Sequence, residues 1–191
     1  ARRWAEEYPA ADLSVVSAGR AASHASIACL NVSHFDRRRG EFRHRQAGRG
    51  GIGHAVRTGP YLGQRVTVDG PEYSTCAALG TNCGIFDPAW VVEANHYCDA
   101  YGVDTISFGG VCAFAMECWE RGVLDAPRTG GLALEWGSGE AQLDLLHLLA
   151  DGQGFGRLAG QGVRAMQGAF AANGWGGERF LADIGMQTKG L

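Results

Sequence analysis

Residues 87–122 read DPAWVVEANHYCDAYGVDTISFGGVCAFAMECWERG, and this stretch predicts two consecutive helices. Asp87-Pro88 is typical of a helix start, because aspartate caps free N–H groups and proline fits the first turn. Gly102 and Gly122 are typical of helix ends, because glycine readily adopts the left-handed conformation found there. We therefore expect one helix before each of these glycines.

The two helices differ in their apolar patterns. In residues 88–101 the apolar positions recur at roughly helical spacing, which indicates a helix with one buried face. Residues 107–121 are apolar on nearly all sides, which is typical of a central core helix. We expect the two helices to pack against each other, with the second almost fully buried.

The remaining sequence divides into a strand-rich part and a helical part. Strand-like patterns fall before residue 70, at 13–17 and at 65–69, whereas helical patterns occupy about 140–150, 154–172 and 177–184. The predicted fold class is α+β, an N-terminal part of mixed β structure followed by a mainly helical domain. We place the boundary between residues 1–58, the end of a β-rich domain, and residues 59–191, an incomplete helical domain.

Composition is that of a packed globular chain. Of the 191 residues, 46% are hydrophobic and 19% charged, which allows one domain with a core. The net charge of -3 gives no reason to expect nucleic-acid binding, and no apolar run is long enough for a membrane helix. We expect a cytoplasmic protein without membrane contact.

The six cysteines show no C-x-x-C pair, so the usual zinc and iron–sulfur spacings are absent. Cys98, Cys112 and Cys118 lie in the predicted buried helices. Free buried thiols favour a reducing compartment over a disulfide scaffold. His147 lies on an apolar helix, where a histidine is more often a hydrogen-bonded core residue than a metal ligand. We predict no metal ligands in this chain.

A glycine-rich segment, Gly48-Arg49-Gly50-Gly51-Ile52-Gly53, follows a basic stretch. It matches G-x-G-x-x-G, but the preceding residues make a poor buried strand, so the pattern does not favour a dinucleotide site. Consecutive glycines can form an anion-binding nest, and arginine adds charge-assisted bonds to phosphate. The alternative is a tight turn beside a solvated basic face.

Two acids lie around the end of the first predicted helix. Asp99 lies in its last turn, where the helix dipole disfavours a carboxylate, and Asp104 follows just after the glycine stop. A group from outside the local chain would explain both positions. The alternative is that one of them caps the next helix or pairs with an arginine.

Several of these segments together resemble the aldehyde ferredoxin oxidoreductase family, with a finer similarity to the tungsten subunit of the class II benzoyl-CoA reductases. The family resemblance rests on segments 47–53, 70–73, 79–87, 99–107 and 113–122. The finer similarity rests on 68–73, 106–109, 184–186 and 189–191.

The resemblance implies a tungsten or molybdenum ion between two metallopterins, magnesium bridging their phosphates, and a nearby [4Fe-4S] cluster. It implies that the arginine–glycine loop contacts pterin phosphates and that the two acids hydrogen-bond the pterin ring. It also places an acidic residue near the cofactor and a catalytic carboxylate in the G-P-E-Y segment. The expected cofactor-binding residues are Arg49, Gly50, Gly51, Gly53, Glu93, Asp99 and Asp104, and the expected catalytic residue is Glu72.

The sequence also departs from the family pattern. The C-x-x-C-x-x-x-C cluster motif normally precedes G-P-E-Y, but no cysteine lies between Gly53 and Gly70. We therefore expect no [4Fe-4S] cluster on this chain. The usual P-E-Y-E is Pro71-Glu72-Tyr73-Ser74, so one active-site carboxylate is replaced. A fragment, a deleted homologue and a partial subunit all fit these departures.

The resemblance leads to two classes of function. As an enzyme, the chain would belong to an oxidoreductase that reduces an aromatic acyl-CoA or oxidises an aldehyde. Its electron partner would be an iron–sulfur subunit or ferredoxin, in an oligomer. The other class is a non-catalytic pterin-binding remnant without the cluster.

Overall fold

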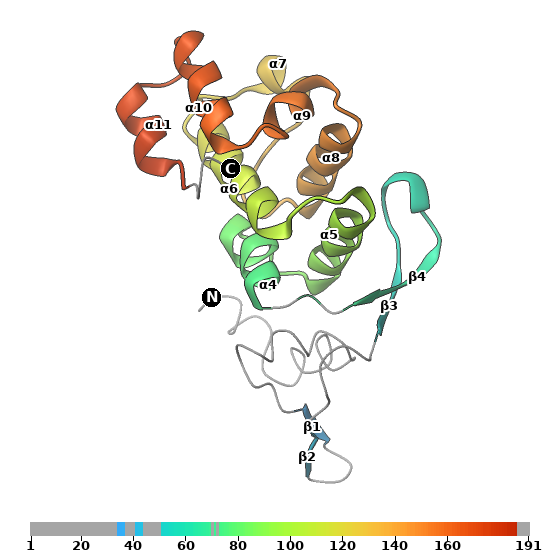
Figure 1. Ribbon diagram of the computed structural model, residues 1–191. Coiled ribbons are helices and arrows are strands. Elements are labelled where there is room, and N and C mark those ends of the chain that lie inside the picture. The colour runs from blue at the N-terminus through green and yellow to red at the C-terminus, as the bar shows by residue number, and fades with distance from the viewer. Residues whose placement is uncertain (1–33, 37–40, 44–50, 70, 72, 187–191) are drawn as a thin grey trace.

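The computed structural model describes residues 34–36, 41–43, 51–69, 71 and 73–186. Among these, a body of helices carries a β hairpin along one side (Figure 1). The hairpin consists of β3 (Gly51–Ala55) and β4 (Arg65–Asp69), paired antiparallel from Gly51 opposite Asp69 to Ala55 opposite Arg65. A short 3-10 helix, η1 (Gly59–Tyr61), lies in its loop. A second antiparallel pair joins β1 (His34–Asp36) to β2 (Glu41–Arg43).

The helices follow in chain order. They are α4 (Tyr73–Leu79), η2 (Thr81–Cys83), α5 (Pro88–Tyr101), α6 (Thr105–Glu120), α7 (Ala126–Thr129), α8 (Gly139–Ala150), α9 (Gly154–Ala159), α10 (Val163–Ala172) and α11 (Glu178–Ile184).

Helix α5 begins and ends where the sequence predicts. The Asp87 side chain accepts a hydrogen bond from the Ala89 N–H at 2.8 Å, and Pro88 occupies the first helical position. Gly102 ends the helix with a φ of 70°, a conformation that L residues with a side chain rarely adopt. The prediction for residues 88–101 is confirmed.

Helix α6 is the central helix of the core. It begins at Thr105, two residues earlier than predicted, because Asp104 caps it. Phe108, Phe114 and Met116 are among its buried side chains, so the predicted near-complete burial is confirmed. Gly109 allows α4 to cross closely, since a Cβ there would lie 2.5 Å from the Ala78 carbonyl oxygen.

The first two long helices lie in one core, as expected, but their main packing partners are other helices. Helix α5 packs chiefly against α8 and α4, whereas α6 packs chiefly against α4. The two share one core, but α4 and α8 make the main contacts with α5. Helix α4 comes close to α6 because Gly109 has no side chain at their crossing point. The sequence did not predict α4 at 73–79, so its contacts with both long helices were not expected.

The later helices complete the other end of the body (Figure 1). Helices α8 and α9 pack together, and α10 contacts α9, α11 and α6. The glycine-interrupted helical stretch predicted at 154–172 is confirmed: its interruption lies at residues 160–162, where Gly162 adopts a φ of 89°. The predicted helices at 140–150 and 177–184 are confirmed within one residue.

The helical half of the predicted fold is confirmed, and so is the strand at 65–69. The strand predicted at 13–17 lies outside the described residues, and the boundary at residue 58 stays a prediction. Cys98, Cys112 and Cys118 are buried and free, as expected. Among the described residues, no helix combines the length and apolarity needed to cross a membrane.

Candidate functional site

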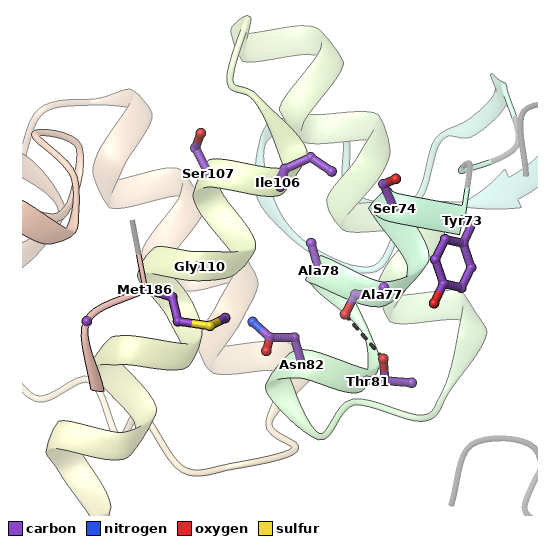
Figure 2. A pocket seen from close by; sticks show the side chains of 11 residues that line it. Tyr73, Ser74, Ala77, Ala78, Thr81, Asn82, Ile106, Ser107, Gly110 and Met186 are labelled. Carbon is purple, nitrogen blue, oxygen red and sulfur yellow. Dashed lines mark hydrogen bonds between the residues drawn. The ribbon is translucent and has the colours of Figure 1, made fainter. Parts of the chain in front are cut away.

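An open cleft of about 1020 Å³ lies where the first turns of α4 and α6 meet η2 and the end of α11 (Figure 2). It is formed by segments far apart in the sequence. The lining residues are Tyr73, Ser74, Ala77, Ala78, Thr81, Asn82, Ile106, Ser107, Gly110, Gly185 and Met186.

The two helices that form the cleft are fixed to each other. The hydroxyl groups of Thr75 and Thr105 lie 2.8 Å apart and hydrogen-bond the starts of α4 and α6 together. The close contact between Gly109 and Ala78 joins the same helices further along. The cleft wall is therefore built on two mutually restrained helices, which suits a site that must hold a ligand in one orientation.

The cleft combines exposed apolar side chains with uncharged polar groups. Tyr73, Ile106 and Met186 are 47%, 45% and 73% exposed, although large apolar side chains are usually buried. Ser107 and Asn82 add a hydroxyl and an amide, and none of the described residues that line the cleft carries a charged side chain. This mixture is typical of small-molecule sites, in which a mainly apolar wall carries a few polar groups.

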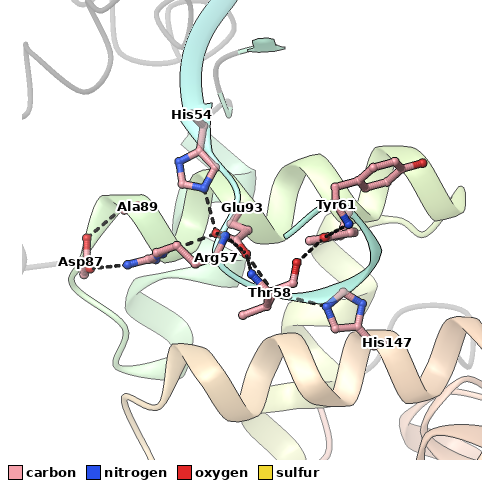
Figure 3. A network of polar contacts seen from close by, with 9 residues as sticks. His54, Arg57, Thr58, Tyr61, Asp87, Ala89, Glu93 and His147 are labelled. Carbon is pink, nitrogen blue, oxygen red and sulfur yellow. Dashed lines mark hydrogen bonds and ion pairs between the residues drawn. The ribbon is translucent and has the colours of Figure 1, made fainter. Parts of the chain in front are cut away.

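A second polar arrangement surrounds Glu93 of α5, between the hairpin and the helices (Figure 3). Its carboxylate is fully buried and accepts hydrogen bonds from His54 Nε2 at 2.8 Å, the Thr58 N–H at 2.8 Å and the Thr58 hydroxyl at 2.8 Å. The Arg57 N–H lies 3.0 Å from both carboxylate oxygens. Glu93 thus anchors residues 54–58 to helix α5.

The ionisation of Glu93 follows from these contacts. Burial raises the pKa of Glu93, but hydrogen bonds from His54, Thr58 and the backbone N–H groups of Arg57 and Thr58 favour the ionised form. The net pKa lies below the ordinary value of 4.5. The Arg57 guanidinium also lies 3.6 Å from the ring centre of Trp90, which stabilises the same segment by a cation–π contact.

His147 of α8 continues the network. Because the Thr58 hydroxyl donates to Glu93, it accepts from His147 Nε2 at 3.3 Å, and His147 Nδ1 accepts from the Tyr101 hydroxyl at 2.8 Å. Burial lowers the pKa of His147, which favours this neutral form. Tyr97 donates to the Thr58 carbonyl at 2.6 Å. The prediction of a hydrogen-bonded core histidine at 147 is confirmed.

The structure gives Asp104 a local partner. Its carboxylate accepts from the Ser107 N–H at 2.7 Å and caps α6, so the capping alternative is correct. The premise that Asp104 requires a partner from elsewhere is wrong, because a cap replaces the missing intrahelical hydrogen bond. Asp99 and Asp104 are both exposed, and neither lines the cleft, although Ile106 and Ser107 follow Asp104 directly.

Glu93 has an internal role in the described structure, because its hydrogen bonds to His54 and Thr58 fix it to the hairpin end. The sequence did not indicate this, because His54 and Thr58 are separated from Glu93 by more than thirty residues. Its expected place beside a cofactor stays a prediction.

The glycine segment also differs from the expected nest. Gly51 and Gly53 lie in the extended strand β3, opposite Asp69 and Thr67, whereas a nest needs alternating helical conformations. Arg49 and Gly50 lie outside the described residues.

Glu72 lies outside the described residues as well, but its neighbour Tyr73 lines the cleft. Ser74, Asn82 and Met186 were not singled out as site residues. No local pattern marks them, because the cleft forms only when α4, α6 and the end of α11 come together. Within the described part of the chain, no three His, Cys, Asp or Glu side chains are grouped as a metal ion would need.

Comparison with known proteins assigns the chain to a family. Residues 44–191 match the family described as aldehyde ferredoxin oxidoreductase, domains 2 and 3, and this is most of the chain. The chain therefore belongs to the aldehyde ferredoxin oxidoreductase family.

Individual relatives agree with this assignment. A tungsten-containing aldehyde ferredoxin oxidoreductase of Pyrococcus horikoshii is 42% identical over 53% of this chain and 17% of its own length. The aliphatic sulfonate oxidoreductase, WOR-like subunit, of Pyrococcus furiosus is 37% identical over 56% of this chain and 17% of its own length. A tungsten-containing aldehyde ferredoxin oxidoreductase of Thermococcus kodakarensis is 48% identical over 42% of this chain and 13% of its own length. The matched stretch spans less than a fifth of each relative.

Proposed function

We propose that this chain forms part of the cofactor and substrate site of a tungsten-pterin oxidoreductase that oxidises aldehydes. One observation carries the proposal: the G-P-E-Y segment and the segment at 99–107 meet at one cleft, where Tyr73 and Ser107 line the same cavity. The family assignment and the relatives named as tungsten-containing aldehyde ferredoxin oxidoreductases support it.

The described residues near the cleft fit a pterin ligand. Asp104 uses Oδ2 to cap α6, while no hydrogen bond within the described structure engages Oδ1, so that oxygen is available to a ring or amino N–H. We propose that Asp104 binds the pterin ring in this way, and that Asp99 contributes to the same binding site. A carboxylate acceptor makes such hydrogen bonds stronger than a neutral one.

The remaining assignments complete the proposed site. Arg49 and Gly50, which directly precede β3 along the chain, would bind pterin phosphates together with magnesium, and Glu72 would act on the substrate. Arginine suits the first task because its planar guanidinium donates two parallel bonds to phosphate. When bound, the tungsten or molybdenum centre would supply the electron exchange with substrate.

Glu93 has a positioning role in this proposal. It fixes residues 54–58, which follow the proposed phosphate-binding segment directly along the chain. The geometry of β3 relative to α5 would thus depend on this side chain.

Reduction of an aromatic acyl-CoA is a second candidate. Two segments that carry the similarity to benzoyl-CoA reductases, 106–109 and 184–186, contribute Ile106, Ser107, Gly185 and Met186 to the cleft. In either reaction we propose that a ferredoxin or an iron–sulfur subunit exchanges electrons with the site, within an oligomer. A [4Fe-4S] cluster would be held outside this chain.

Metal and pterin analysis tests the proposal. The chain, produced in an anaerobic host supplied with tungstate, should carry tungsten or molybdenum and release a fluorescent pterin on oxidation. Arg49→Ala should lower the pterin content, whereas Arg179→Ala on the exposed face of α11 should not. Absence of both metal and pterin in a folded wild-type chain would overturn the proposal. Pterin without any redox activity of the assembled protein would favour the non-catalytic remnant.

A further inference from the structure

We propose that the tip of the β3–β4 hairpin, residues 59–62, lifts away from helix α5 on acidification while the rest of the chain stays folded, and that His96 is the residue that senses the pH. This device goes beyond the proposed function and needs no bound cofactor. Three features carry it: a weakly held tip, a buried histidine nitrogen without a partner beside it, and a glycine fitted tightly against the helices.

The tip is held to the helices less strongly than the base of its loop. At the base, the Glu93 carboxylate accepts from the N–H and the hydroxyl of Thr58, both at 2.8 Å (Figure 3). At the tip, the Tyr61 N–H donates to the Tyr97 hydroxyl at the longer distance of 3.2 Å. The Tyr61 ring centre lies 5.9 Å from that of Tyr97 and 5.5 Å from that of His96. Because residues 59–62 are all exposed, the tip can open locally before the base does.

His96 is poorly placed to carry a charge while the tip is closed. Its Nε2 atom is buried and has no hydrogen-bond partner in the described part of the chain. A protonated imidazole donates from both nitrogens, so the charged ring would present a buried N–H without an acceptor. When the tip lifts, the Tyr61 ring that packs edge-on against His96 moves away and water can hydrate the charge. Protonation of His96 therefore favours the lifted tip.

The titratable groups around His96 come from the hairpin and from α5. They are His54 and Tyr61 from the hairpin, and Glu93, Tyr97 and Asp99 from α5. Helix α8 contributes His147, whose ring contacts Tyr97. Burial and the nearby His54 lower the pKa of His96, and attraction to Asp99 and Glu93 opposes this only in part. The closed tip is thus favoured above the ordinary histidine pKa of 6.5 and becomes less favourable as the pH falls below it.

His147 is a different case, although it also lies beside the tip. Both of its ring nitrogens have partners, the Thr58 hydroxyl at 3.3 Å and the Tyr101 hydroxyl at 2.8 Å. The Tyr101 hydroxyl donates to the neutral ring and can rotate to accept from the protonated one. Protonation of His147 therefore does not by itself require the tip to move.

Gly59 offers a way to lift the tip without a change of pH. It adopts a φ of 63°, and a Cβ there would collide with the His147 ring and lie 2.8 Å from the Tyr97 hydroxyl oxygen. Gly59→Ala should therefore push the tip away from the helices. Gly63 provides the matched control, because its φ is 79° but a Cβ there meets no atom within 4 Å. Both substitutions strain the backbone in a similar way, and only the first displaces the tip.

NMR titration of the histidine ring signals in the purified 191-residue chain tests the link between the tip and His96. If protonation lifts the tip, a lifted tip must in turn make His96 easier to protonate. In the wild type, His96 should titrate below 6.5. Its pKa should rise toward 6.5 in Gly59→Ala and in Tyr61→Ala, and Gly63→Ala should leave it at the wild-type position. If Gly59→Ala does not fold, Tyr61→Ala decides, because it removes only a half-exposed ring.

Amide hydrogen exchange tests the opening itself. Each rate is divided by that of an unstructured peptide, so that the intrinsic effect of pH cancels. From about pH 7.5 to about pH 5.5, the corrected rate at Tyr61 should rise by at least about threefold and at most about tenfold, the limit for one proton and an ordinary pKa in the open form. The rate at Thr58 should change by less than about twofold, because Glu93 holds this residue. His96→Phe should abolish the rise at Tyr61.

Any of four results would overturn the assignment of His96 as the sensor of a lifting tip. They are an unchanged His96 pKa in the variants that displace the tip, a rise at Tyr61 below about threefold, a rise that persists in His96→Phe, and equal rises at Tyr61 and Thr58. The last result would mean that the whole hairpin loosens. These measurements use the cofactor-free chain, so they fail separately from the metal and pterin analysis.

Discussion

Replacing Glu93 with glutamine should destabilise the chain strongly, although the side chain keeps its shape. The carboxylate accepts from His54 Nε2, from the Thr58 N–H and hydroxyl, and from the Arg57 N–H, all within 3.0 Å. Glutamine offers one oxygen in place of two and directs an NH2 group at donors. At least one strong acceptor interaction becomes a donor–donor contact.

The magnitude follows from the burial of this group. Hydrogen bonds to a charged partner contribute about 1.5–3 kcal/mol each, and an unsatisfied buried donor costs about 1–3 kcal/mol. Glu93 is 0% exposed, so water cannot replace the lost bonds. We expect Glu93→Gln to lower the free energy of unfolding by about 2–4 kcal/mol.

Urea unfolding followed by tryptophan fluorescence measures the global effect, and amide hydrogen exchange at Thr58 measures the local one. Glu135→Gln provides the matched control, because Glu135 is exposed and its side chain makes no hydrogen bond within the described structure. The control should stay within about 0.5 kcal/mol of wild type. A Glu93→Gln variant equally close to wild type, with unchanged Thr58 protection, would refute the anchoring role.

The pH dependence of stability gives a second check, namely whether the ionised form of Glu93 is the one that stabilises the fold. The pKa of Glu93 is lowered in the folded chain, so its contribution is present above 4.5 and is lost as the pH falls through the folded pKa. The stability difference between wild type and Glu93→Gln should therefore be largest near neutral pH and shrink on acidification. A difference that grows at acid pH would contradict ionisation as its source.

Three further changes test other parts of the structure. Asp104→Ala should lower the free energy of unfolding by about 0.5–2 kcal/mol in thermal unfolding, because it removes the cap of α6. Asp104→Asn should change this free energy little, because asparagine also caps helices. Equal losses of stability in the two variants would contradict the capping role. Gly109→Ala should destabilise the chain by about 1–3 kcal/mol through its collision with Ala78, and a neutral result would show that α4 moves freely. Burial lowers the pKa of His147, so stability should fall as the pH drops through 6.5, and His147→Gln should flatten this slope in urea titrations.

The helices and their ends were determined by local sequence. Asp87-Pro88, Gly102 and Gly122 act through the backbone of a few neighbouring residues, so their effect is independent of the rest of the chain. The apolar character of residues 107–121 likewise required burial wherever the helix packed. Family membership was also readable from the sequence, because it rests on the order of separate short segments.

The partners of these elements were decided by tertiary structure. Asp104 fitted both a cap and an external ligand, and only the 2.7 Å bond from Ser107 distinguished them. The sequence predicted a loop at Gly51 and Gly53, but in the structure both residues lie in strand β3, which pairs with β4. Glu93 accepts hydrogen bonds from hairpin residues that lie far from it in the sequence. The cleft forms only where α4, α6 and the end of α11 come together. Local patterns fix backbone conformation, because that depends on neighbouring residues, whereas contacts between distant segments depend on how all the helices pack together.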